Sequence, residues 1–170
     1  MIEEENYIYL VKIEHCTVVD GEGLRTSVYC SYCLHNCKGC HNQKYQKLES
    51  GKKVHINEIY NEILKDEICN VTFTGGDPFF QAKAFYNLAQ KIKENTNKTI
   101  WVYSGFTYEQ ILQNIEARKL LELCDVLVDG KFILSKFDRN LKWKGSSNQK
   151  CISIKESLEK GKVVLYDEVE

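Results

Sequence analysis

The sequence predicts an α/β fold, with a mostly parallel sheet that forms an open, partial TIM-type (β/α) barrel. Runs rich in β-branched and aromatic residues alternate along the chain with segments whose apolar residues recur at helical spacing. Such alternation is typical of βαβ units, in which successive strands lie parallel. About four of these units are recognisable, which is too few to close a barrel of eight.

The first half of the chain supplies two expected strands and one expected helix. A glycine-containing turn leads into an alternating run, which predicts a strand over residues 25–32. Asn57 is the expected N-cap of the helix. The apolar face of this helix is formed by Ile59, Tyr60, Ile63 and Leu64. A second strand is expected over residues 70–74, just before the turn at residues 75–78.

The second half continues the alternation. A helix follows the turn, and its buried face consists of Phe80, Ala84, Phe85, Leu88, Ala89 and Ile92. A strand is expected over residues 99–104, and then a helix that opens with a capping box of Thr107 and Gln110 and continues to Leu121. A further strand is expected over residues 125–128, with weaker candidates at 151–154 and 162–166.

Composition indicates one domain that spans residues 1–170. The chain is 43% hydrophobic and 28% charged, which provides enough apolar material for one core. Its net charge of -1 argues against a nucleic-acid partner or binding to an acidic membrane surface. The acidic first residues are unlike a signal peptide, and no apolar run reaches the length of a membrane span. A cytoplasmic location is therefore expected.

The eight cysteines indicate a reducing compartment, where thiols bind metals or lie buried. Four of them are scattered along the chain, and each is expected to be a small buried hydrophobic side chain: Cys16, Cys69, Cys124 and Cys151. The histidines show no ligand spacing of their own. Packing or solvated roles are expected for His15, His35, His41 and His55.

The strongest chemical signal is a short loop that contains Cys33, Cys37 and Cys40. Closely spaced loop thiolates can bind three corners of a [4Fe-4S] cube. The fourth iron would then lack a protein ligand, and an open coordination position is where a metal site carries out chemistry. The loop follows the strand over residues 25–32, at the end of the sheet where α/β proteins place their active sites. The spacing therefore favours a catalytic cluster.

A four-thiolate zinc site or a disulfide is the alternative for this loop. Cys30 precedes Cys33 at a CxxC spacing, so it could join the three loop cysteines around zinc. Zinc ribbons usually separate their two cysteine pairs by a dozen or more residues, whereas three residues separate them here. Cys30 also lies in the alternating run of the strand, where a buried, inert thiol is expected.

The turn Gly75-Gly76-Asp77-Pro78 is the second chemical signal and holds the only proline of the chain. Adjacent glycines let a ligand approach the backbone, and Pro78 rigidifies the exit into the helix. The backbone carbonyls and the Asp77 carboxylate are suitable acceptors for a ligand ammonium group. An ordinary strand-to-helix turn explains the same residues, but the position on the strand after the cysteine loop favours a binding role.

Together, CxxxCxxC and a GGDP turn on the next strand resemble the radical S-adenosylmethionine enzymes. The segment Asp20–Arg25, followed by the cysteine loop and His41-Asn42, resembles the subgroup that activates glycyl radical enzymes. Three later segments are most similar to activases of the anaerobic (class III) ribonucleoside-triphosphate reductases: 101–105, 125–132 and 143–149. The resemblance covers residues 18–149 and implies an open barrel of the radical S-adenosylmethionine type.

The resemblance also implies roles for individual residues. Cys33, Cys37 and Cys40 would bind the cluster, and the amino and carboxylate groups of S-adenosylmethionine would chelate its open iron. The residues implied in binding S-adenosylmethionine are Gly39, Gly75, Gly76, Asp77, Pro78, Ser104, Asp129 and Lys131. Two of them depart from the common pattern. Gly39 stands where many relatives have an aromatic residue near the adenine, and Asp77 stands where many have Glu.

The implied activity is reductive cleavage of S-adenosylmethionine to a 5′-deoxyadenosyl radical, which removes a hydrogen atom from a glycine of the large reductase subunit. That subunit and an electron donor such as flavodoxin or ferredoxin are the implied partners. No acid–base catalytic side chain is implied, because the cofactor carries the chemistry.

Two alternatives remain: an activase of another glycyl radical enzyme, such as pyruvate formate-lyase, and a small zinc-binding interaction protein. The segment 143–149 argues against the first, and the turn at 75–78 argues against the second.

Overall fold

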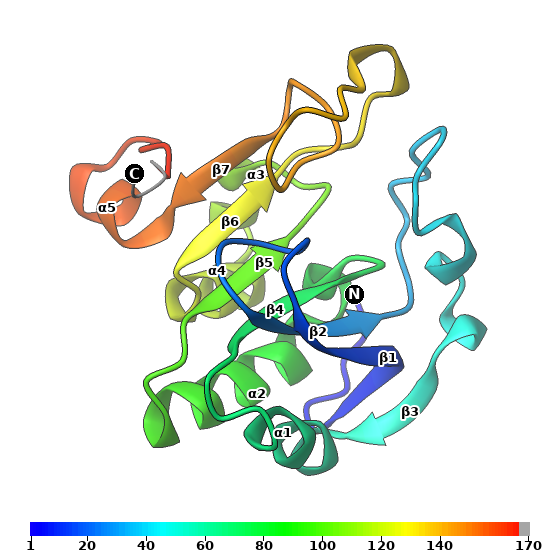
Figure 1. The fold of residues 1–170 in the computed structure, drawn as a ribbon, viewed down its shortest axis with the longest axis vertical. Coiled ribbons are helices and arrows are strands. Elements are labelled where there is room, and N and C mark those ends of the chain that lie inside the picture. The colour runs from blue at the N-terminus through cyan, green and yellow to red at the C-terminus, as the bar shows by residue number, and fades with distance from the viewer. Residues whose placement is uncertain (167–170) are drawn as a thin grey trace.

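A computed structural model describes residues 1–166 and contains a seven-stranded sheet in the order β3-β1-β2-β4-β5-β6-β7 (Figure 1). The strands are β1 Tyr7–Thr17, β2 Arg25–Cys30, β3 Lys52–His55, β4 Asn70–Gly75, β5 Ile100–Tyr103, β6 Val126–Asp129 and β7 Lys150–Ser153. The α-helices are α1 Ile56–Leu64, α2 Ala82–Asn95, α3 Tyr108–Leu112, α4 Ile115–Leu123 and α5 Ile154–Lys160. None of these helices is both long and apolar enough to cross a membrane.

The sheet is mixed, so the prediction of a mostly parallel sheet is wrong. Strands β2, β4, β5 and β6 are parallel to one another, whereas β1, β3 and β7 run antiparallel to their neighbours. The connection between β1 and β2 is the short segment 18–24, and a parallel pair would need a crossover of about a dozen residues or more. The chain is therefore a mixed α/β protein with a parallel centre.

The four central strands lie where the sequence predicted them, within one to two residues. Strands β1 and β3 were not predicted, although the alternating aromatic and aliphatic residues from Tyr7 onward carry the signal. The weak candidate at 151–154 is β7, whereas 162–166 contributes only an isolated bridge between Ile152 and Leu165.

Two helix predictions need correction at their ends. The N-cap of α1 is His55, whose ring nitrogen accepts a hydrogen bond from the backbone N–H of Asn57, and not Asn57 itself. The capping box of Thr107 and Gln110 is confirmed. The helix that it opens ends at Leu112, and a separate helix, α4, begins with Asn114 as its own N-cap. A polar residue that can accept the free N–H groups of a first turn starts a new helix there.

The main core lies between one face of the sheet and helices α1, α2 and α4 (Figure 1). Because strand side chains alternate between faces, Val28, Phe73 and Val102 point to these helices. The opposite face carries a smaller apolar cluster of Trp101, Val126 and Val128, together with buried polar residues such as Ser27 of β2 and Thr72 of β4. The helices thus cover one face of the sheet and leave the other to the loops.

Arg25, at the start of β2, lies in this second face and is 1% exposed. Its guanidinium donates hydrogen bonds to the carbonyl oxygens of Glu22, Val71 and Thr99 and to the hydroxyl of Thr72. Burial lowers the pKa of Arg25 to about 10. One side chain therefore ties the turn before β2 to the first residues of β4 and to Thr99, which directly precedes β5.

Replacing Arg25 with Met should lower the free energy of unfolding by about 3 kcal/mol, because buried carbonyl groups lose their donor. Urea unfolding followed by circular dichroism measures the change. Arg118→Met is the matched control: Arg118 is exposed and pairs with Glu122 on α4, and its loss should cost at most about 0.5 kcal/mol. Equal losses for the two variants would contradict this role for Arg25.

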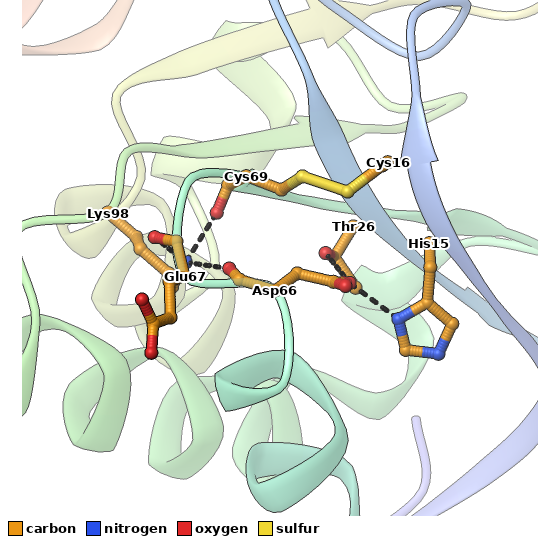
Figure 2. The surroundings of a disulfide bond; sticks show 7 residues. All are labelled: His15, Cys16, Thr26, Asp66, Glu67, Cys69 and Lys98. Carbon is orange, nitrogen blue, oxygen red and sulfur yellow. Dashed lines mark hydrogen bonds and ion pairs between the residues drawn. A yellow bond between two sulfur atoms is a disulfide. The ribbon is translucent and has the colours of Figure 1, made fainter.

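A disulfide between Cys16 and Cys69 links the end of β1 to the segment that precedes β4 (Figure 2). The expectation of two separate buried thiols is therefore wrong, and Cys16 is in fact exposed. The turn that holds Cys69 is fixed further by Lys98, whose ammonium donates to the carbonyl oxygens of Asp66, Glu67 and Cys69. The two cysteines meet because the antiparallel β1–β2 pair brings residue 16 beside the start of β2.

The other isolated cysteines differ from one another. Cys124 is buried, as predicted, and burial raises the pKa of its thiol well above the usual range. Cys151, in β7, is only half-buried and packs beside the smaller apolar cluster.

Replacing Cys16 and Cys69 together with Ser should lower the free energy of unfolding by about 2–4 kcal/mol, since the bond restricts the unfolded chain. The same loss is expected when wild type is treated with a reductant, and the double variant should show no response to it. Urea midpoints with and without reductant provide the measurement. A wild-type urea midpoint that does not change when reductant is added would argue against the disulfide.

Candidate iron–sulfur site

The predicted site residues lie in loops at one end of the parallel strands. The cysteine loop follows β2, the turn 75–78 begins at the last residue of β4, residues 104–107 follow β5, and residues 129–131 begin at the last residue of β6. Because these strands are parallel, their carboxyl ends meet at the same edge of the sheet. The fold therefore brings together segments that lie far apart in the sequence (Figure 1).

Cys33, Cys37 and Cys40 are each half-buried. Burial raises the pKa of Cys33 to about 12, and the nearby charges of Asp77 and the other two thiols add to the rise. A hydrogen bond from the backbone N–H of His35 acts in the opposite direction and lowers this pKa. Burial and then the Cys37 thiol raise the pKa of Cys40, while the N–H of Asn42 acts in the opposite direction. Two of the three sulfurs thus accept backbone N–H groups, and hydrogen bonds of this kind to the sulfurs tune the potential of a cluster.

This donor set fits an iron–sulfur cube. Three thiols from one loop can each bind a different iron, so they need not converge on a single point. Within residues 1–166, no three His, Cys, Asp or Glu side chains lie close enough together to hold a single metal ion. Cys30 is fully buried in the core beneath the helices, as predicted for an inert thiol. Burial raises its pKa well above the usual range.

Gly75 and Gly76 bring the end of β4 against the backbone at the end of β2. Gly75 has a φ of +103°, and a Cβ there would lie 2.4 Å from the Cys30 carbonyl oxygen. A Cβ on Gly76 would lie 2.6 Å from the carbonyl oxygen of Tyr32. The backbone N–H groups of Gly76 and Asp77 donate to the carbonyl oxygens of Cys30 and Tyr32. The glycines thus permit close packing of two backbones, in addition to any approach of a ligand.

The Asp77 carboxylate is 1% exposed and fully engaged. One oxygen accepts from the backbone N–H of Phe79 at 2.9 Å, which caps the turn into α2. The other accepts from His35 Nε2 at 2.7 Å, from the Ser104 hydroxyl at 2.8 Å and from the Gly105 N–H at 2.9 Å. Ser104 is itself buried, and its hydroxyl is committed to Asp77. Asp77 therefore links the cysteine loop to the loop after β5.

Asp129 and Lys131 point to different surroundings. Asp129 is 3% exposed, and its carboxylate accepts the backbone N–H groups of Tyr108 and Lys150. Burial raises the pKa of Asp129, and these N–H groups and the charge of Lys150 oppose the rise. Lys131 is exposed. Asp129 and Lys131 do not form a simple surface ion pair, because the carboxylate is buried and the ammonium is exposed.

The segment 145–149 packs beside the site. Gln149 accepts the N–H groups of Gly145 and Ser146 and donates to the carbonyl oxygen of Gly130. A cavity of about 180 Å³ lies next to the third cysteine and is lined by Cys40, His41, Asn42, Tyr103, Phe132, Gly145 and Gln149. Gly39 is exposed nearby with a φ of +78°, and a Cβ there would lie 3.0 Å from Leu134. Gln149 thus holds the loop 145–149 against the segment after β6.

Sequence reasoning missed two residues that join these loops. His35 was expected to have only a packing or solvated role, yet it bonds to Asp77. Asn42 donates from its side chain to the carbonyl oxygen of Gly75 at 2.9 Å. Both residues lie within or directly after the cysteine loop, and this position was the signal for His35. For Asn42, the resemblance of His41-Asn42 to the activase subgroup was a second signal.

Comparisons with known sequences identify the family of this chain. A family model described as a 4Fe-4S single cluster domain matches residues 19–152. An anaerobic ribonucleoside-triphosphate reductase-activating protein of Vibrio cholerae is 38% identical over 141 residues, which cover 78% of this chain and 89% of that protein. The chain belongs to this family. Its predicted resemblance to these activating proteins is confirmed.

Two further members of the activating-protein family show the range of the similarity. The Escherichia coli K12 protein is 34% identical over 140 residues, covering 78% of this chain and 90% of its own. The protein of Enterobacteria phage T4 is 32% identical over 148 residues, covering 84% of this chain and 92% of its own. The matched region of the 4Fe-4S domain includes the cysteine loop, the turn 75–78 and the segment 129–131.

Gly75→Ala should lower the free energy of unfolding by about 3 kcal/mol, since the new Cβ adds backbone strain and meets the Cys30 backbone. Gly23→Ala is the matched control: its φ is +74°, but no atom lies within 4 Å of the new Cβ. The control should lose only about 1 kcal/mol. Thermal unfolding of both variants separates the effect of backbone strain from that of overlap with the Cys30 backbone. Similar losses of stability in the two variants would contradict the close approach of Gly75 to Cys30.

Proposed function

We propose that this chain is a radical S-adenosylmethionine enzyme that generates the glycyl radical of an anaerobic ribonucleoside-triphosphate reductase. Cys33, Cys37 and Cys40 bind a [4Fe-4S] cluster, and one iron remains open for S-adenosylmethionine. The observation that carries the proposal is three half-buried thiols in one loop, in a chain whose relatives are named for activating that reductase. The 4Fe-4S description of the matching family supports the cluster.

In this proposal the chain's own residues bind and orient the cofactors. The carbonyl groups of the turn 75–76 accept the methionine ammonium group, and Asp77 and Pro78 hold that turn in place. Asp129, Lys131 and Ser104 lie at the ends of the next two strands on the methionine side, where the Lys131 ammonium suits a carboxylate. Gly39 offers backbone without a side chain beside the adenine. The parallel strands β2, β4, β5 and β6 form the partial barrel of the radical S-adenosylmethionine type, within a single domain.

When bound and reduced, such a cluster supplies one electron for cleavage of the S–C5′ bond, which gives methionine and the 5′-deoxyadenosyl radical that takes a Cα hydrogen from the reductase glycine. Because the three thiols are only half-buried, the cluster would lie at the edge of the sheet, where a partner protein can reach it. The partners are the large reductase subunit and an electron donor such as flavodoxin or ferredoxin, and the location is cytoplasmic.

Cys37→Ala should abolish both cluster assembly and S-adenosylmethionine cleavage, because two thiols cannot hold the cube. The test reconstitutes wild type and variant anaerobically with iron and sulfide, then adds reductant, S-adenosylmethionine and the large subunit of an anaerobic ribonucleotide reductase. Wild type should produce a glycyl doublet in electron paramagnetic resonance that requires S-adenosylmethionine. Cys124→Ser, at a buried thiol far from the loop, is the control and should leave the doublet unchanged.

The other outcomes identify the alternatives. Formation of 5′-deoxyadenosine without a doublet would keep the chemistry and assign the chain to another glycyl radical enzyme, such as pyruvate formate-lyase. A wild-type protein that retains zinc and produces neither signal would be the small zinc-binding interaction protein, and the proposal would fail. A Cys37→Ala variant that still cleaves S-adenosylmethionine would overturn the assignment of ligands.

A further inference from the structure

His35 lies inside the cysteine loop, two residues after Cys33 and two before Cys37. Unlike its exposed neighbours Leu34 and Asn36, it turns its side chain inward, where only 6% of that side chain is exposed. Its Nε2 atom lies 2.7 Å from the Asp77 carboxylate. A loop residue between two proposed ligands is therefore anchored to the turn after β4.

The surroundings hold the imidazole ring in one orientation. The ring packs against Phe106 with a centroid distance of 4.5 Å and against Phe80 at 5.3 Å. On its remaining side, a Cβ on Gly105 would lie 2.3 Å from the ring, so only glycine fits at that position. The ring thus fills a slot built by the segments after β4 and β5.

The partner of His35 is fixed just as firmly. Asp77 also accepts hydrogen bonds from Phe79, Ser104 and Gly105, so its carboxylate cannot follow a displaced histidine without breaking bonds to other segments. An N–H on Nε2 can donate to this carboxylate in either charge state of the ring, given the appropriate tautomer. The hydrogen bond between His35 and Asp77 therefore fixes the cysteine loop relative to the edge of the sheet.

We propose that His35 is a positioning residue that, through Asp77, sets the orientation of Cys33 and Cys37 relative to the turn 75–78. Residues behind metal ligands typically matter in this way, because they orient the ligands. The inference rests on the proposed function, in which the cluster bound by the loop and the S-adenosylmethionine bound by the turn must lie at the correct distance and orientation for reaction. A small displacement of reacting groups has a large effect on rate.

The same contact gives a reason for Asp77 at a position where many radical S-adenosylmethionine enzymes have Glu. The aspartate caps Phe79 with one oxygen while the other meets His35 and Ser104. A glutamate would carry its carboxylate one methylene further from the turn, into the space that the His35 ring occupies. In this chain, His35 and Asp77 therefore form a matched pair.

The test compares His35→Phe with His35→Gln in the full chain. Phenylalanine keeps a ring between Phe80 and Phe106 but removes the donor, whereas glutamine can place an N–H near the position of Nε2. We expect His35→Phe to bind iron and sulfide and to form 5′-deoxyadenosine about 10- to 100-fold more slowly than wild type. His35→Gln should recover most of the rate. A role in packing alone would give the opposite order.

A second readout needs no cluster. In the iron-free chain, alkylation of Cys33 and Cys37 by iodoacetamide should be several-fold faster in His35→Phe than in wild type, and close to wild type in His35→Gln. Peptide mass spectrometry measures both rates. If His35→Phe does not fold, His35→Met removes the same donor with a flexible side chain.

His15→Phe is the matched control. His15 also pairs with an aspartate, Asp66, but at the opposite end of the sheet and with 41% of its side chain exposed, so both readouts should stay at wild-type values. Equal behaviour of wild type and His35→Phe in both assays would overturn the proposal. A wild-type chain that forms no 5′-deoxyadenosine would refute the proposed function, while the alkylation rates would still decide the position of His35.

Discussion

The close approach of two backbones at the ends of β2 and β4 is the constraint on which the site depends. Gly75 and Gly76 leave no room for a side chain against Cys30 and Tyr32, and backbone hydrogen bonds hold the two segments together. The cysteine loop leaves β2 at this point, and the turn into α2 leaves β4 at the same point. Any separation of these strand ends would move the three thiols away from the turn.

A single buried carboxylate extends this contact to a third loop. Asp77 accepts hydrogen bonds from its own turn, from the cysteine loop and from the loop after β5. A buried charge is stable only when donors surround it, and here each donor comes from a segment that the site must place. The buried carboxylate of Asp77 therefore also defines the relative positions of the loops.

The opposite end of the sheet has a structural role. Arg25 ties three segments together through their carbonyl oxygens, Lys98 does the same for the turn that precedes β4, and the Cys16–Cys69 bond closes that turn onto β1 (Figure 2). These contacts fix the starts of the central strands. The ends of the same strands can then carry exposed loops, such as that of Cys33 to Cys40, without loss of the sheet.

The sequence by itself determined the four central strands, the helices between them and the cysteine loop, because apolar periodicity, the capping box and short-range spacing are local signals. It also determined the family, which the relatives confirm. Only the tertiary structure decided the antiparallel pairing of β1, the partner of Cys16 and the contact between His35 and Asp77. Each of these joins residues about 10 to 50 positions apart, and such pairs form only when the sheet sets which strands are neighbours.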